Sequence, residues 1–288
     1  MKKPIFEGVC TALVTPFKED GLSLSRFRRL LSRQLEAGIR AFVVCGTTGE
    51  APTLTEDEKL TLFRQAKELA GNKAVILAGT GSNCTKSAVS LSIKAQEQGA
   101  DGLLLVTPYY NKCTEEGLLA HYSAIAQAVS IPILLYNVPS RTGVDIPVSV
   151  YQKLSTIPNI LGVKEASPNL RKIAEIRSAC PEDFYVYSGN DDLLLPVLSL
   201  GGKGVISVAS NLKPKEMIRI TEAWDQGNQK EARNLFIKQL PFIKALFSEV
   251  NPIPVKAALR IAGMDCGGCR LPLTDLSPEH MEKLKKYL

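Results

Sequence analysis

The chain has 288 residues, of which 45% are hydrophobic and 22% are charged, a composition typical of a globular protein with a large core. Its net charge of +6 comes from lysines and arginines scattered along the chain. This distribution argues against nucleic-acid binding and is compatible with anionic small-molecule ligands. No apolar run approaches the ~20 residues that a membrane-spanning helix needs, so we expect no membrane segment.

The N-terminal segment and the cysteines bear on where the protein works. Residues 1–8 lack the apolar stretch of a secretory signal, so we expect a cytoplasmic protein. Seven cysteines argue against a disulfide framework in a chain of this length. Cys266 and Cys269 form a C-x-x-C pair, but His121 and His280 are the chain's only histidines, so we expect no metal site. We interpret the pair as two thiols in a glycine-rich turn, with a redox role as the alternative.

Short β-rich runs alternate with helical patterns from the start of the chain. The runs cover residues 9–17, 41–47, 74–79, 102–107, 133–137, 160–164, 184–188 and 204–209. Several are almost continuously apolar, as strands buried on both faces of a parallel sheet are. Between them, apolar residues recur at spacings of three and four, as at Phe27, Leu30 and Leu31, which indicates amphipathic helices packed on a sheet.

About eight β/α units of similar length predict a closed (β/α)8 barrel, the TIM barrel of the α/β class. An open doubly wound sheet is the alternative, but residues 15–18 after the first run lack the glycine-rich dinucleotide fingerprint of such sheets. Only helical patterns continue towards the C-terminus. We therefore predict a barrel domain over residues 1–224 and a helical appendage over residues 225–288, with a kink at Pro241.

Polar residues follow several predicted strands, where barrel enzymes have their active sites. The glycine-rich turn at residues 46–50, after the second strand, contains Thr47 and Thr48. Its amides and hydroxyls suit a carboxylate, and an ordinary tight turn is the alternative. Asn83 lies in a similar turn after the third strand, where we favour a structural role.

The fourth, fifth and seventh strands end in further candidates. Tyr109 and Tyr110 follow the fourth strand, Tyr136 lies in the fifth, and Arg141 is in the loop after it. A tyrosine at a strand end can transfer protons, although packing explains most such residues. An arginine can bind a carboxylate through two parallel hydrogen bonds. Gly189, after the seventh strand, would let a ligand approach the backbone; a capped helix start is the alternative.

Lys164 lies at the end of the apolar run 160–164. A buried ammonium is unfavourable unless it is paired or loses its proton, and desolvation makes a lysine amine a nucleophile that can form a Schiff base. The alternative is an ordinary lysine whose head reaches water at a strand end. Because the same predicted barrel end carries tyrosines, an arginine and an anion-binding turn, we favour covalent amine catalysis on a keto acid.

Together these segments resemble the dihydrodipicolinate synthase / N-acetylneuraminate lyase family of pyruvate-dependent class I aldolases. The resemblance extends from residues 8–17 to residues 251–256, and residues 46–50, 136–139 and 162–165 are highly specific in combination. Within this family, residues 109–111 and 140–143 resemble the synthase branch. Sialic acid lyases and sugar-acid aldolases generally lack the arginine found here at position 141.

The resemblance implies that Lys164 forms an imine with pyruvate, with no other cofactor, and that the derived enamine attacks L-aspartate 4-semialdehyde. Tyr136, Thr47 and Tyr110 would then transfer protons, with Tyr110 contributed by a neighbouring subunit. The implied binding residues are Thr48 for the pyruvate carboxylate, Arg141 for the semialdehyde carboxylate, and the backbones of Gly189 and Ile206. Family members are commonly homotetramers that form as a dimer of dimers.

Two other functions stay open at this stage. One is another aldolase of the family, acting on a sugar acid or a hydroxy-keto acid, against which Arg141 argues. The other is a catalytically silent pyruvate-binding barrel, against which the intact set of Lys164, Tyr136 and Thr47 argues.

Feedback regulation is a further expectation from the resemblance. Lysine-inhibited members bind L-lysine at a subunit interface. Asn83 and Tyr109 of that site are retained here, and the other expected positions hold Ala51, Glu56 or Lys59, and Ser87. The resemblance therefore predicts weak or absent inhibition by L-lysine.

Overall fold

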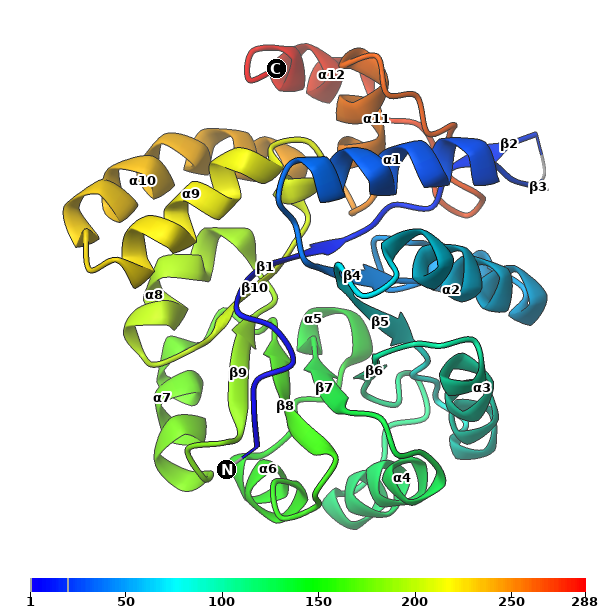
Figure 1. Ribbon diagram of the computed structural model, residues 1–288, viewed down its shortest axis with the longest axis vertical. Helices are drawn as coiled ribbons and strands as arrows, with labels where there is room; N and C mark the ends of the chain where they lie inside the picture. The colour runs from blue at the N-terminus through cyan, green and yellow to red at the C-terminus, as the bar shows by residue number, and fades with distance from the viewer. Residues whose placement is uncertain (1, 20) are drawn as a thin grey trace. The chain divides into compact units, whose positions relative to one another are not determined.

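The computed structural model describes residues 2–19 and 21–288. Eight strands form a closed barrel in the order β1-β10-β9-β8-β7-β6-β5-β4, and helices follow them in the chain (Figure 1). The predicted (β/α)8 barrel is therefore confirmed. The barrel strands are β1 (Gly8–Ala12), β4 (Ala41–Val44), β5 (Val75–Gly79), β6 (Gly102–Val106), β7 (Ile133–Asn137), β8 (Ile160–Glu165), β9 (Tyr185–Ser188) and β10 (Gly204–Ser207).

The described chain divides into two compact units, and the first comprises Met1–Glu7 and Leu77–Ile206. In this unit the strands pair in parallel from β5 through to β10. Figure 1 shows α3, α4, α6 and α7 on the outside of these strands. The helices of the unit are α3 (Thr85–Glu97), α4 (Glu115–Ala128), α5 (Pro139–Thr142), α6 (Val148–Leu154), α7 (Leu170–Ala179), the 3-10 turn η2 (Asp191–Leu193) and α8 (Leu194–Ser199).

The second unit comprises Gly8–Ile76 and Ser207–Leu288. It contains the parallel pair β1–β4 and a short antiparallel hairpin of β2 (Phe17–Lys18) and β3 (Gly21–Leu22), which the sequence pattern did not predict. The helices of the unit are α1 (Leu24–Glu36), η1 (Ala51–Thr53), α2 (Glu56–Ala70), η3 (Ala209–Asn211), α9 (Pro214–Asp225), α10 (Gln229–Leu246), α11 (Ile253–Ile261) and α12 (Pro278–Lys285).

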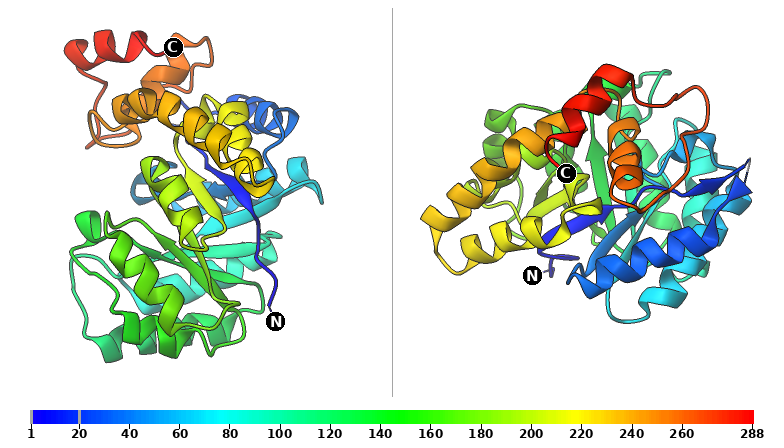
Figure 2. Two further views of the ribbon diagram at one scale, coloured as in Figure 1. Left: turned by 90° about the vertical axis from the view of Figure 1, so that its left-hand side faces the viewer. Right: turned by 90° about the horizontal axis from the view of Figure 1, so that it is seen from above.

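The C-terminal part of the second unit is helical. Helices α9 and α10 lie side by side, and α10 also contacts α11 and α12 (Figure 2). Pro241 lies inside α10, and a kink there stays a prediction. In the described residues no strand follows Ser207, as expected from the helical patterns near the C-terminus. The domain boundary at residue 225 stays a prediction as well.

Local signals set the ends of several helices. At the start of α2, the Thr55 hydroxyl accepts a hydrogen bond from the Glu58 amide, and the Glu58 carboxylate accepts one from the Thr55 amide. This capping box satisfies amides that the first helical turn leaves without partners. Thr114 accepts from the Gly117 amide at the start of α4. Gly71 ends α2 with φ +53°, a conformation that glycine adopts without a steric penalty.

The strand that carries Lys164 contains a register irregularity. Ile160 of β8 pairs with Ile133 of β7, but the next partners are Gly162 and Leu134, so Leu161 is an extra residue of β8. Gly162 lies against β9, where a Cβ atom would overlap the carbonyl oxygen of Tyr185. Only glycine fits this position without moving the backbone.

We expect Gly162→Ala to destabilise the protein by about 3 kcal/mol or more, because backbone atoms must move to admit the methyl group. For a chain of this size the loss corresponds to a fall in melting temperature of roughly 6–10 °C. Thermal and urea unfolding would measure it. Gly21→Ala is the matched control, because the nearest atom to an added Cβ is the Lys18 carbonyl oxygen at 3.9 Å. Equal melting temperatures for the two variants would contradict the steric argument.

Candidate active site

Lys164 and Tyr136 lie on adjacent strands of the first unit. They are direct register partners in the β7–β8 pair, and each side chain is buried. The Lys164 Nζ atom lies 4.2 Å from the centroid of the Tyr136 ring. In parallel strands, register partners face the same side of the sheet, so both side chains project from one face. The pair therefore brings an amine beside the ring of a phenol in a setting with little water.

Arg141 follows Tyr136 in a short, well-supported segment. It lies in α5, which ends at Gly143 with φ +68°. The Thr142 hydroxyl lies within hydrogen-bond distance of the Val138 and Val144 carbonyl oxygens, at 3.2 and 3.1 Å. The Arg141 side chain is exposed. A guanidinium held on an ordered turn in this way can bind a carboxylate in a two-pronged geometry.

Gly189 and Ile206 come from the ends of the next two strands of the barrel. The Gly189 amide donates to the Glu165 carbonyl oxygen at 2.7 Å. A Cβ on Gly189 would lie 2.5 Å from the Ala166 Cβ atom, so packing against β8 already requires glycine here. Ile206 is fully buried within β10. That the backbones of Gly189 and Ile206 line the substrate site stays a prediction.

The loop after β6 carries the two neighbouring tyrosines. Tyr110 is 91% exposed and has φ +70°, an unusual backbone conformation for a tyrosine. Tyr109 is partly exposed, and the Asn111 side-chain amide donates to the Asn83 carbonyl oxygen at 2.9 Å. Such strain concentrates at functional sites, because the surrounding structure must sustain it. The loop thus presents the phenol of Tyr110 outward.

The second unit contains the glycine-rich turn with Thr47 and Thr48. The Gly49 and Glu50 amides donate to the Gly46 and Thr47 carbonyl oxygens at 3.0 and 3.1 Å. Neither of these turn bonds uses the Thr47 or Thr48 amide. Thr48 is buried, and its hydroxyl oxygen accepts a hydrogen bond from the Asn251 side chain at 2.9 Å. The predicted turn is therefore present, and its carboxylate-binding role stays a prediction.

A buried ion pair supports this turn. Glu50, at the end of the turn, has φ +56° and accepts hydrogen bonds from the Lys256 ammonium at 2.7 Å and from the Arg270 amide at 2.9 Å. Lys256 also donates to the Gly268 carbonyl oxygen at 2.7 Å. Removing one partner of a buried pair leaves an uncompensated charge, so this pair fixes the conformation of the turn. Lys256 lies in the 251–256 motif, and its partner was not predicted.

Arg270 links the segment that follows the 46–50 turn to the start of α2. Its guanidinium donates to the Thr53 carbonyl oxygen at 2.9 Å and to both carboxylate oxygens of Glu58. The hydrogen bonds from Arg270 hold the pKa of Glu58 below its usual value. The guanidinium also stacks 4.3 Å from the centre of the Phe17 ring. No sequence motif indicated these contacts, because they join residues separated by more than two hundred positions.

The cysteines are free thiols with different acidities. Burial raises the pKa values of Cys266 and Cys269 to about 11. Cys84 is exposed, and hydrogen bonds from Ser87 lower its pKa. Because the thiolate is the reactive form, the C-x-x-C pair has the character of unreactive thiols at neutral pH. In the described residues, no three side chains of His, Cys, Asp or Glu come together as a metal site would require.

A closed eight-stranded barrel with a buried lysine beside a tyrosine at adjacent strand ends has the architecture used by Schiff-base aldolases. The family model for the dihydrodipicolinate synthetase family matches residues 5–288. The chain belongs to this family. The family predicted from the sequence motifs is therefore confirmed, and the chain is an enzyme of this family, as its curated relatives are.

Curated relatives are similar over the whole chain. A 4-hydroxy-tetrahydrodipicolinate synthase from Acetivibrio thermocellus is 47% identical, covering 100% of this chain and 98% of the relative. One from Caldicellulosiruptor saccharolyticus is 51% identical, covering 99% of this chain and 97% of the relative.

None of the helices in the described part of the chain has the length and apolar character that a membrane crossing requires.

Solved structures agree with this assignment. Dihydrodipicolinate synthase from Aquifex aeolicus superposes with a TM-score of 0.96 at 44% identity, covering 98% of this chain and 97% of that one. The enzyme from Cyanidioschyzon merolae, solved with lysine bound, gives a TM-score of 0.96 at 44% identity, covering 99% and 97%.

At pH 7.5 we expect iodoacetamide to modify Cys84 well before Cys269, because a lower pKa leaves a larger thiolate fraction. Raising the pH to 9.5 should accelerate Cys269 by about tenfold per pH unit, since its thiolate fraction still rises throughout this range below its pKa. Peptide mass spectrometry would follow each site, and Cys84→Ser should abolish the fast phase. Modification of Cys269 at the rate of Cys84 at pH 7.5 would revive a redox role for the pair.

Proposed function

We propose that the chain is a 4-hydroxy-tetrahydrodipicolinate synthase that condenses pyruvate with L-aspartate 4-semialdehyde. The observation that carries this proposal is the buried Lys164 amine, 4.2 Å from the centre of the Tyr136 ring, in a chain of this family. Curated relatives with this name cover essentially all of the chain. The exposed Arg141 on the turn after Tyr136 supports a second substrate that carries a carboxylate.

In the proposed reaction, the Lys164 amine adds to the pyruvate ketone and water leaves, giving a protonated imine. The imine draws electrons from the adjacent methyl group, which loses a proton and becomes the carbon of an enamine. That carbon forms a bond to the aldehyde carbon of the semialdehyde, whose oxygen takes up a proton. The substrate amine then displaces the lysine amine, closing the six-membered ring. The imine itself is the electron sink, so this scheme needs no external cofactor.

The remaining residues take the roles that the family resemblance implies. Tyr136 would move protons near the imine, with Thr47 and Tyr110 in the same relay. Thr48, within the buried turn of the second unit, would hold the pyruvate carboxylate. The backbones of Gly189 and Ile206 would complete the lining.

We also propose a homotetrameric assembly in the cytoplasm. The 91% exposure of Tyr110, combined with its constrained backbone, supports its insertion into a neighbouring subunit. The strained backbone at Tyr110 costs free energy, and a phenol left in water provides no interaction that offsets this cost. Burial of the ring by a partner subunit would provide one.

Regulation by L-lysine stays a prediction. Asn83 and Tyr109 lie on neighbouring loops of the first unit, joined by the hydrogen bond from Asn111 to the Asn83 carbonyl oxygen. Ala51 has no side chain that could bind an ammonium or a carboxylate. We therefore propose that lysine binds weakly, in contrast to the lysine-bound relative from Cyanidioschyzon merolae.

Borohydride with pyruvate tests the covalent step. We expect the wild-type protein to gain the mass of a reduced pyruvate adduct on Lys164, and Lys164→Ala to gain none. Turnover should fall by on the order of 10⁴- to 10⁶-fold in this variant, as expected when a catalytic nucleophile is removed. Absence of an adduct on the wild-type protein would rule out the proposed chemistry.

Arg141→Ala tests the second substrate. We expect the KM for the semialdehyde to rise roughly 10- to 100-fold, since a charge-assisted hydrogen bond is lost, while imine formation with pyruvate stays near the wild-type rate. Arg171→Ala is the matched control, because Arg171 is exposed on α7 and pairs only locally with Glu175 at 3.0 Å. Equal losses in both steps would argue against the assigned role, and turnover of N-acetylmannosamine instead of the semialdehyde would indicate a different aldolase.

A further inference from the structure

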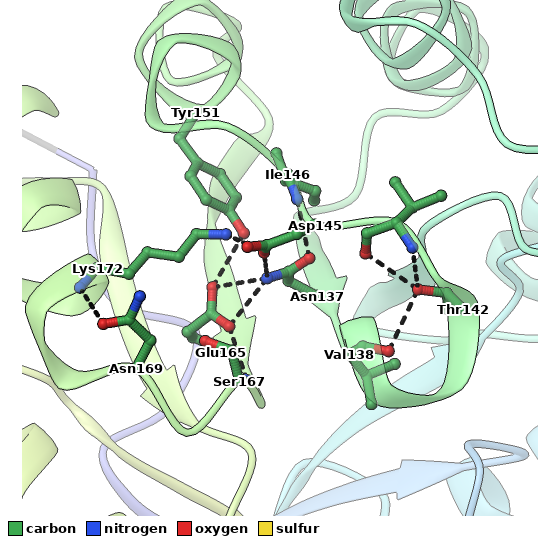
Figure 3. Close-up of polar contacts among 11 residues, drawn as sticks. Asn137, Val138, Thr142, Asp145, Ile146, Tyr151, Glu165, Ser167, Asn169 and Lys172 are labelled. Atoms are coloured by element: carbon green, nitrogen blue, oxygen red, sulfur yellow. Dashed lines mark hydrogen bonds and ion pairs between the residues drawn. The ribbon is translucent and has the colours of Figure 1, made fainter.

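A buried polar network lies beside Lys164 and Tyr136, and the proposed reaction does not use it. Figure 3 shows its members between the end of β7, the end of β8, helix α6 and helix α7. Asn137, Tyr151, Glu165 and the Lys172 side chain are all buried. Buried polar groups weaken a fold unless they are hydrogen-bonded, so such a cluster needs a reason to be where it is.

The network lies one residue along from the reactive pair on both strands. Tyr136 is the register partner of Lys164, and Asn137 is the register partner of Glu165. Because successive side chains of a strand point to opposite faces, the reactive pair lies on one face and the Asn137–Glu165 pair on the other. Asn137 and Glu165 therefore act on the reactive residues through the strands and do not contact the reacting atoms.

Asn137 uses every hydrogen-bonding group of its side chain. One side-chain N–H is shared by the two Glu165 oxygens, with N–O distances of 2.9 and 3.1 Å. The other donates to the Asp145 carboxylate at 2.7 Å, and the amide oxygen accepts from the Ile146 backbone at 3.1 Å. The Asn side chain offers two N–H donors and one acceptor oxygen at its tip, so no other side chain of similar size can make this set of hydrogen bonds.

The partners of Asn137 come from two different parts of the site. Glu165 is the last residue of β8 and directly follows Lys164. Asp145 and Ile146 end the segment that begins at α5 and carries Arg141. One side chain thus ties the strand end that holds the amine to the segment that holds the guanidinium.

Glu165 is fixed from its other side as well. Its carboxylate accepts hydrogen bonds from the Tyr151 hydroxyl at 3.1 Å and the Ser167 amide at 2.8 Å. Burial and the nearby Glu165 carboxylate raise the pKa of Tyr151 well above its usual value, so its hydroxyl stays a donor. Asp145 in turn forms an ion pair with Lys172. The further partners of both carboxylates thus favour the orientation in which each accepts a hydrogen bond from Asn137.

We propose that Asn137 is a positioning residue that sets the Lys164 strand end and the Arg141 segment in register with each other. The inference rests on the proposed function, since Lys164 and Arg141 then serve the two successive substrates. Asn137 would make one geometry serve both imine formation and capture of the semialdehyde.

Asn137→Ala tests the proposal through two separate measurements. Borohydride trapping in a rapid-quench experiment gives the rate of imine formation with pyruvate alone, and steady-state turnover gives the KM for the semialdehyde. We expect imine formation to slow by roughly 10- to 100-fold and the KM to rise by at least about tenfold, because a displacement of ~1 Å has effects of this size. A change in only one of the two quantities would overturn the proposal.

Two shape-conserving variants serve as controls. Thr142→Val loses hydrogen bonds only within the Arg141 segment, so it should raise the KM and leave the imine rate within about twofold of wild type. Tyr151→Phe loses a hydrogen bond only to Glu165, so it should slow imine formation and leave the KM within about twofold. If both controls change both the imine-formation rate and the KM, any disturbance of this region affects both steps. Asn137 then has no special role in linking them.

The remaining outcomes also decide the matter. Rates are expressed per adduct-forming molecule, so a purely structural role for Asn137 would lower the adduct yield and leave both rate parameters unchanged. If Asn137→Ala does not fold, Asn137→Ser takes its place; if neither folds, Asn137 is a structural residue and the proposal is wrong. A wild-type protein without an adduct refutes the proposed function, whereas a wild-type-like Asn137→Ala refutes this inference alone.

Discussion

The pairing of β7 with β8 is the constraint on which the candidate chemistry depends. It sets Tyr136 opposite Lys164 and Asn137 opposite Glu165, after an extra residue at Leu161 has shifted the register. Because the side-chain period of a strand is two, a slip by one residue would exchange the faces of Lys164 and Glu165. The amine would then lie in the buried carboxylate network, and a carboxylate would take its place beside the phenol.

The two faces of these strands divide the polar residues by task. One face carries the candidate pair Lys164 and Tyr136, and the other carries Asn137 and Glu165, which are hydrogen-bonded to each other. In the second unit, a buried ion pair between Glu50 and Lys256 lies at the end of the 46–50 turn. In both units a buried carboxylate with several hydrogen-bond partners adjoins the backbone that carries candidate site residues.

Much of the fold follows from patterns that act locally. Seven of the eight barrel strands begin and end within three residues of the predicted runs, because continuous apolar stretches are required of strands buried on both faces. The first predicted run, 9–17, is too long, since β1 ends at Ala12. The capping box at Thr55 and the glycine at the end of α2 were equally readable. The β2–β3 hairpin was not, since each strand has only two residues and no alternation can be recognised over that length.

The candidate site was predictable only in part, for a physical reason. Lys164 and Tyr136 stand out as polar residues at the ends of apolar runs, and Arg141 stands out as a charged residue in the loop that follows one of them. Asn137 and Glu165 stand at the same ends, and nothing local distinguishes the face to which each points until the register is known. The supporting contacts of Lys256 and Arg270 were not predicted for a different reason. Their partners are distant in the chain, and no periodic pattern joins them.

The contacts of Glu50 have a consequence for the order in which the protein matures during synthesis. Its ammonium partner lies 206 residues later in the chain, and the Arg270 amide lies 220 residues later. At ~5–20 residues per second, a ribosome needs roughly 10–40 s to make the intervening chain. The turn at residues 46–50 is thus among the earliest segments to emerge and among the last to acquire its final support. A nascent chain would contain Lys164 well before it could hold this turn in its final conformation, so the supported form of the turn is reached only as translation ends.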